Sequence, residues 1–138
     1  MSSPRIIVDT GPLVAFLTEA EALHGWVASK FAELPAPFVT CEPVLAETFF
    51  LLSRLPDGPR RFFDLLGSGL LEIEMSVLAE QAALGKLIHK YKDLPMSLAD
   101  ACLVRLAELH PKASVFTLDT HFRVYRKHGR QQIPVIMP

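Results

Sequence analysis

The feature that most constrains this chain is the apolar run Ile6-Ile7-Val8, which ends directly on the carboxylate of Asp9. Three β-branched residues in succession are typical of a short strand buried on both faces, as in a parallel sheet. Gly11 and Pro12 fit the N-cap and first position of a helix, so residues 13–17 are expected to begin a helix packed on that strand. Asp9 then lies at the carboxyl end of a parallel strand, where open α/β sheets bind ligands. Taken alone, it fits a turn residue that caps the helix better than a ligand.

Length and composition bound the class of protein. The chain has 138 residues, of which 50% are hydrophobic and 21% charged, so residues 1–138 are expected to form one domain. The net charge of -1 gives no bulk bias toward nucleic acid, although residues 110–138 carry a net charge of +4. Cys41 and Cys102 belong to no CxxC pair, which favours small core residues in a reducing compartment. Neither an apolar leader nor an apolar run of transmembrane length occurs, which predicts a cytoplasmic protein with no membrane partner.

Short apolar strands alternate with helical stretches along the whole chain. We expect strands near 38–40, 70–74, 113–118 and 133–137, and helices over 22–33, 44–55, 60–66, 76–91, 97–109 and 121–128. Thr40 and Ser76 are predicted to cap the helices that follow them. The strands at 70–74 and 133–137 are expected at sheet edges, because one alternates with acids and the other contains a proline. The alternation predicts an α/β fold with a mainly parallel central sheet flanked by helices.

Two more acids occupy positions that invite comparison with Asp9. Asp119 follows the apolar strand at 113–118 and precedes a helix, which repeats the arrangement around Asp9. Asp100 has the spacing of a capping box with Ser97 and opens the most apolar helix of the chain. Its helical neighbours are apolar, so its side chain is expected to face inward. A capping role and a functional role for Asp100 are equally open on this pattern.

Acids gathered on one sheet edge indicate a bound cation. Asp9, Asp119 and Asp100 would repel one another and raise one another's pKa without one. All-oxygen sites suit Mg²⁺ or Mn²⁺, and phosphodiester hydrolysis is the natural chemistry of such ions. Glu47 borders the apolar arc of its helix, so taken alone it is expected to be a surface residue. Asp93 lies in a chain break, where a turn residue is expected and an accessory acid of the site is the alternative.

Four short segments then occur in a characteristic order: Ile7-Val8-Asp9-Thr10, Leu45-Ala46-Glu47, Leu98-Ala99-Asp100-Ala101 and Phe116-Thr117-Leu118-Asp119. With this order and spacing the chain resembles the PIN-domain ribonucleases, and among them the VapC-type toxins of type II toxin–antitoxin pairs. The resemblance covers nearly the whole chain and implies a PIN-like three-layer sandwich. It also implies a Mg²⁺ or Mn²⁺ site with Asp9 and Asp100 as principal ligands and Glu47 and Asp119 completing the acidic cluster. Thr10 and Thr117 would hydrogen-bond waters or ligands.

The activity that the resemblance implies is endonucleolytic hydrolysis of single-stranded or looped RNA, with a small antitoxin protein as partner. A non-toxin PIN-domain nuclease that processes RNA is one alternative. The other is a catalytically silent PIN-like interaction module, which predicts damaged acids, whereas all four are intact. The motifs GxxxxGK and GxGxxG are absent, so nucleotide-binding enzymes are poorly supported.

Two surface features suggest further contacts. Phe50 lies outside the apolar arc of its helix, so we expect it to reach a protein partner or the second subunit of a homodimer. Arg123 and Arg126 belong to a basic segment with Lys127 and Arg130, and are expected to help hold RNA near an acidic site. A solvated helix face explains this basic segment equally well.

Overall fold

The computed structural model describes residues 4–138, and its centre is a sheet of five parallel strands. In the order of the sheet these are β3 (Leu71–Ile73), β2 (Phe38–Thr40), β1 (Ile6–Val8), β4 (Ser114–Phe116) and β7 (Val135–Ile136). Ile7 pairs with Val39 on one side and Val115 on the other. As predicted, β3 and β7 are the edge strands. Residues 1–3, on which the expectation of an absent leader partly rests, lie outside the described residues.

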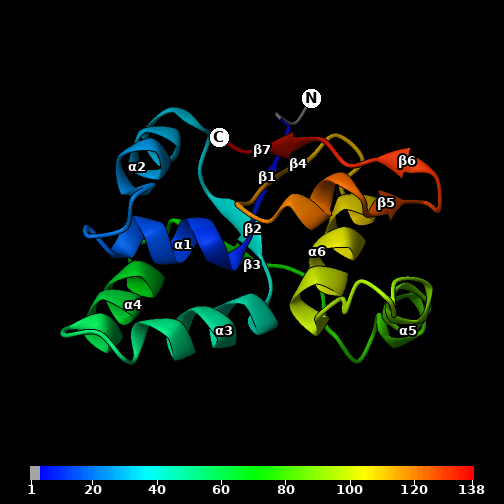
Figure 1. Ribbon diagram of the computed structural model, residues 1–138, viewed down its shortest axis with the longest axis horizontal. Coiled ribbons are helices and arrows are strands. Elements are labelled where there is room, and N and C mark those ends of the chain that lie inside the picture. The colour runs from blue at the N-terminus through cyan, green and yellow to red at the C-terminus, as the bar shows by residue number, and fades with distance from the viewer. Residues whose placement is uncertain (1–3) are drawn as a thin grey trace.

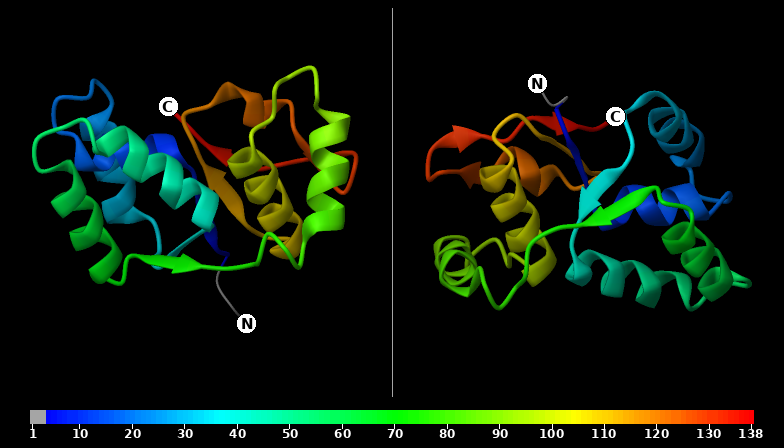
Figure 2. Two further views of the ribbon diagram at one scale, coloured as in Figure 1. Left: turned by 90° about the horizontal axis from the view of Figure 1, so that it is seen from below. Right: turned by 180° about the vertical axis from the view of Figure 1, so that it is seen from behind.

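Helices cover both faces of this sheet (Figure 1). One face carries α1 (Thr10–Leu17), α2 (His24–Glu33), α3 (Glu42–Leu52) and α4 (Gly58–Gly67), and the other carries α5 (Gln81–Lys90) and α6 (Leu98–Leu109). The two faces follow from right-handed crossovers, because the chain steps outward from β1 to β3 and then returns past β1 to β4. The expected three-layer α/β sandwich is confirmed (Figure 2). Within residues 4–138 no helix is long and apolar enough to cross a membrane.

The connections between the strands change direction between β1 and β4. These strands are neighbours, yet the connections that leave them run in opposite directions along the sheet. In parallel sheets such a point opens a crevice at the carboxyl ends of the two strands. The segments that follow Val8 and Phe116 therefore lie beside one another, as the repeated strand-and-acid pattern predicts.

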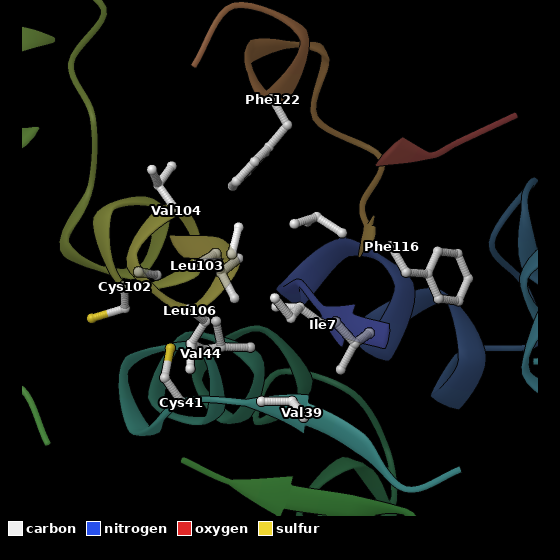
Figure 3. Packing of buried hydrophobic residues seen from close by; sticks show 14 of the residues in the cluster. Ile7, Val39, Cys41, Val44, Cys102, Leu103, Val104, Leu106, Phe116 and Phe122 are labelled. Carbon is white, nitrogen blue, oxygen red and sulfur yellow. The ribbon is translucent and has the colours of Figure 1, made fainter. Parts of the chain in front are cut away.

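The core is built from β-branched strand residues and the apolar face of α6. Figure 3 shows Leu103 and Leu106 of α6 beside Ile7 of β1, all fully buried. Cys41 and Cys102 are free, buried thiols in the same core. A hydrogen bond between these thiols, together with burial, raises the pKa of Cys41. The prediction that both cysteines are core residues is confirmed.

The predicted N-caps of the first and third helices are wrong. The N-cap of α1 is Asp9 rather than Gly11, because the Asp9 carboxylate accepts a hydrogen bond from the backbone of Thr10 at 2.7 Å. The N-cap of α3 is Cys41, since the Thr40 hydroxyl donates instead to the carbonyl oxygen of Val8 at 2.9 Å. In this second case a partner on the neighbouring strand displaces the local cap.

The segment 76–80 and the basic segment 121–128 also differ from expectation. Ser76 accepts a hydrogen bond from Ala79 in a turn, and α5 begins only at Gln81. The predicted helix over 121–128 is a 3₁₀ turn, η1 (Thr120–Arg123), followed by an antiparallel hairpin of β5 (Arg126–Lys127) and β6 (Gln131–Gln132). His128 and Gly129, with φ of 51° and 81°, form the tight turn that ends any helix there.

Candidate active site

Asp9 is the buried centre of the site. It follows β1 at the N-terminus of α1, and its side chain is only 7% exposed. Oδ1 accepts a hydrogen bond from the backbone of Thr10 at 2.7 Å, and Oδ2 accepts one from Thr117 Oγ1, also at 2.7 Å. Each carboxylate oxygen has two lone pairs, so Asp9 keeps acceptor capacity for a ligand. Asp9 is thus both the helix cap and a candidate ligand.

Asp119 reaches the same edge from β4 and is linked to Asp9 through Thr117. The Thr117 hydroxyl donates to Asp9 and accepts a hydrogen bond from the backbone of Asp119 at 3.0 Å. Asp119 then caps η1, because its Oδ1 accepts from the backbone of His121 at 2.9 Å. Thr117 is fully buried, so this chain of contacts fixes the spacing between the two acids.

Asp100 projects from the first turn of α6, where the expected capping box is present. Its backbone donates to Ser97 Oγ at 3.0 Å, while its Oδ2 accepts from the backbone of Ser97 at 3.3 Å. Tyr125 Oη also donates to Oδ2, at 3.0 Å. Burial, and then the charge of Asp100, raise the pKa of Tyr125. Asp100 therefore caps α6, as one of the two interpretations predicts, and it also faces the cavity described next.

The four acids line one cavity of about 460 Å³ at the carboxyl edge of the sheet. Thr10 also lines it, and apolar walls are supplied by α1 and by Leu51 of α3. Glu21, in the loop between α1 and α2, adds a fifth carboxylate to the rim. Within the described residues no lysine or arginine lines this cavity. The cavity is consequently acidic, with no basic side chain on its wall to offset the charge.

Burial and the proximity of like charges raise the pKa values of Asp9 and Glu47. Burial, before any other cause, raises the pKa of Asp9 from 3.8 to about 6. Hydrogen bonds from Thr117 and Thr10 lower it, and the charges of Asp100 and Glu47 raise it again. The pKa of Glu47 is raised as well, first by burial and then by Asp100 and Asp119. The pattern of its own helix predicts a surface position for Glu47, but in the structure Glu47 interacts electrostatically with three other acids.

The donor set fits a divalent cation. All four acids offer oxygen ligands, which hard cations such as Mg²⁺ and Mn²⁺ prefer. Thr10 Oγ1 is buried, lines the cavity and has no hydrogen-bond partner within the protein, so it is free to bond a ligand or a water. In residues 4–138 no three His, Cys, Asp or Glu side chains converge closely enough to enclose an ion by themselves. A cation here would accordingly keep waters and substrate oxygens among its ligands.

Other predicted residues fall outside this cavity. Asp93 is exposed in a turn and does not line it. Arg126 is engaged by the protein itself, because its Nη1 donates to the carbonyl oxygens of Arg123, Val124 and Tyr125 at 2.8–3.2 Å. Arg123 is exposed, with its Nε 3.3 Å from Met137 Sδ.

The basic segment also contains a residue that serves the fold. Lys127 is only 6% exposed and donates to the carbonyl oxygen of Pro111 at 2.9 Å. The ammonium group of Lys127 is therefore bonded within the protein.

Sequence reasoning missed Glu21 and Tyr125. Glu21 gives no pattern, since it is one acid in a polar loop. Tyr125 gives only a weak one, an aromatic residue in a basic segment.

An acidic cavity at the switch point of a parallel sheet is an arrangement suited to a hydrolase that uses a divalent cation. The PIN domain family model matches residues 6–128, and the chain belongs to that family. It is 28% identical over 134 residues to Ribonuclease VapC26 of Mycobacterium tuberculosis, covering 95% of this chain and 99% of that protein. The crystal structure of M. tuberculosis VapC20, described as a sarcin-ricin loop cleaving toxin, matches the fold with a TM-score of 0.70 and 23% identity. That match covers 83% of this chain and 90% of VapC20.

Proposed function

We propose that this chain is a metal-dependent endoribonuclease that hydrolyses RNA phosphodiester bonds, as the toxin of a toxin–antitoxin pair. The observation that carries the proposal is the cavity in which Asp9, Glu47, Asp100 and Asp119 meet. Membership of the PIN family and the similarity to a VapC ribonuclease support the same activity.

We assign the principal cation contacts to Asp9 and Asp100, with Glu47 and Asp119 completing the acidic set. Mg²⁺ or Mn²⁺ bound there would supply Lewis-acid stabilisation of phosphate charge and lower the pKa of a water. Thr117 holds the Asp9 carboxylate in place, and the unpartnered Thr10 hydroxyl is available to orient a water or a phosphate oxygen.

The substrate must approach an acidic cavity, so cations are needed outside it. Exposed Arg123 is the better placed of the two predicted arginines, because the guanidinium of Arg126 is already bonded to the backbone. We propose that Arg123 contacts the RNA backbone and that Arg126 contributes mainly long-range charge.

The proposed protein partners are a small antitoxin and a second copy of this chain. Phe50 on α3 is 55% exposed and Phe63 on α4 is 60% exposed, which gives an apolar surface suited to such a contact. We further propose that residues 1–138 act as one domain in the cytoplasm, where RNA and an antitoxin are both accessible.

The test is the conservative variant Asp9→Asn, assayed for RNA cleavage and for metal-induced stabilisation. Mn²⁺ at a hundredfold excess over Kd should stabilise the wild type by about 2.7 kcal/mol. The variant should lose most of that response and its cleavage activity. Asp93→Asn, which changes an exposed acid outside the cavity, should behave as wild type. Cleavage that persists in Asp9→Asn would refute the metal-site assignment.

A further inference from the structure

Tyr125 is a fully buried tyrosine whose hydroxyl touches one of the acids of the site. Its side chain is 0% exposed, and Oη donates to Asp100 Oδ2 at 3.0 Å. It lies two residues beyond η1 and outside the four segments that carry the family resemblance. The acid-centred description of the site therefore leaves this contact without a role.

The two donors to the Asp100 side chain both use the same oxygen. The backbone of Ser97 donates to Oδ2 at 3.3 Å and Tyr125 Oη donates to Oδ2 at 3.0 Å. Among the hydrogen bonds made by the described residues, none to this carboxylate ends on Oδ1. The two donors come from different parts of the chain, so together they restrain the position of Oδ2. They leave the lone pairs of Oδ1 available, on a side chain that lines the cavity.

The tyrosine is itself held rigidly. Its ring packs edge-on against Tyr91 at 5.0 Å and Phe122 at 5.1 Å between centroids. Its backbone donates to the carbonyl oxygen of His121 at 3.0 Å. Tyr91 Oη, in turn, accepts a hydrogen bond from the backbone of Arg126 at 2.8 Å. The hydroxyl of Tyr125 is accordingly set by packing and needs no rearrangement to meet Asp100.

We propose that Tyr125 is a positioning residue of the metal site: its hydroxyl holds Asp100 Oδ2 so that Oδ1 is presented to the cation. The inference rests on the proposed metal-dependent function. Outer groups that orient a ligating side chain typically change metal affinity or activity by about 10–100-fold when removed. The same segment carries Asp119 as the cap of η1, so one short stretch of chain serves two acids.

The test compares Tyr125→Phe with Tyr91→Phe. Each variant removes one buried tyrosine hydroxyl from the same aromatic cluster and keeps the ring, but only the first removes a contact with Asp100. Mn²⁺ affinity is measured by calorimetric titration of each protein, and kcat and KM are measured on a single-stranded RNA. We expect Tyr125→Phe to raise the Kd for Mn²⁺ and to lower kcat by about tenfold or more. KM for RNA should change little, because the buried hydroxyl does not reach the substrate. Tyr91→Phe keeps the ring that packs on Tyr125 and removes no contact with Asp100, so it should change Kd and kcat far less than Tyr125→Phe.

Equal effects of the two variants on Kd, or no effect of Tyr125→Phe, would overturn the positioning role. Both results would leave the proposed function intact, because the wild type would still bind Mn²⁺ and cleave RNA. A wild type that takes up no Mn²⁺ would instead refute the proposed function, and this inference would fail with it.

A second measurement on the wild type needs no change at the site. The chain contains two tyrosines, so labelling with [¹³Cζ]tyrosine gives two resonances, which Tyr91→Phe assigns. Titration with diamagnetic Mg²⁺ should shift the Tyr125 resonance and leave that of Tyr91 in place. Equal shifts, or none at Tyr125 when Mg²⁺ is bound, would contradict the inference.

Discussion

The clearest quantitative prediction concerns the charge of Asp9 in the metal-free protein. Burial raises its pKa from 3.8 to about 6, so the folded state binds this proton more tightly than the unfolded state. The resulting stability is complete below pH 3.8 and is lost as the pH rises through 6. A pKa shift of this size lowers the free energy of unfolding by about 3 kcal/mol at pH 8 relative to low pH. In Asp9→Asn the side chain at this position is uncharged at every pH, so the variant does not lose this stability as the pH rises.

The assay is thermal unfolding with EDTA at fixed ionic strength, from pH 4 to pH 8. Near pH 4 the wild type and Asp9→Asn should melt at similar temperatures, because protonated Asp and Asn are both neutral and of the same size. At pH 8 the variant should melt higher, by roughly 10 °C for about 3 kcal/mol in a chain of this length. The raised pKa of Glu47 acts in the same direction in both proteins and largely cancels from the difference.

The control is Asp93→Asn, which removes an exposed carboxylate outside the cavity. Its melting temperature should follow that of the wild type across the range. A difference between wild type and Asp9→Asn that does not vary with pH would refute the reasoning. So would a variant that melts below the wild type at pH 8.

Three further predictions follow from the site and the surface. Thr117→Val removes the hydroxyl that donates to Asp9; urea unfolding should show a loss of about 1–3 kcal/mol. Titration by ¹³C NMR should show a further rise in the pKa of Asp9, and an unchanged titration would contradict this. Phe50→Ser should weaken the dimer or a copurified antitoxin about tenfold or more in light-scattering or binding assays. Leu78→Ser, another exposed position, should weaken neither, and equal behaviour of the two variants would count against Phe50 as a contact residue. Arg123→Gln should reduce the salt slope of RNA binding by about one; an unchanged slope would favour a purely solvated arginine.

The parallel strands and their shared edge were predictable because a strand buried on both faces gives a short, uninterrupted run of apolar residues in the sequence. The apolar runs before Asp9 and Asp119 each gave a strand, and these strands are neighbours. Alternation with helices then determined the layers. Asp100 could be placed inward because its helix is apolar on nearly every side.

Two of the predictions that failed, the Thr40 cap and the helix over 121–128, depend on partners distant in sequence. The Thr40 hydroxyl bonds Val8 on the adjacent strand, which no local pattern indicates. The segment 121–128 has helical composition, but Arg126 and Lys127 bond Tyr91 and Pro111 instead. Tertiary hydrogen bonds there outweigh local propensity, since propensities amount to a few tenths of a kcal/mol per residue. The contact between Tyr125 and Asp100 could not be predicted for the same reason, because the two residues are far apart in the sequence.

The order in which the site residues occur along the chain has a consequence for protein synthesis. Asp9 is made first, whereas Asp119 comes 110 positions later. At usual translation rates of about 5–20 residues per second, roughly 6–22 s separate the two. The carboxyl end of β1 therefore remains without its neighbour until β4 has been made, because the two strands are paired in the sheet. The acidic cavity is therefore incomplete until β4 and Asp119 have been translated.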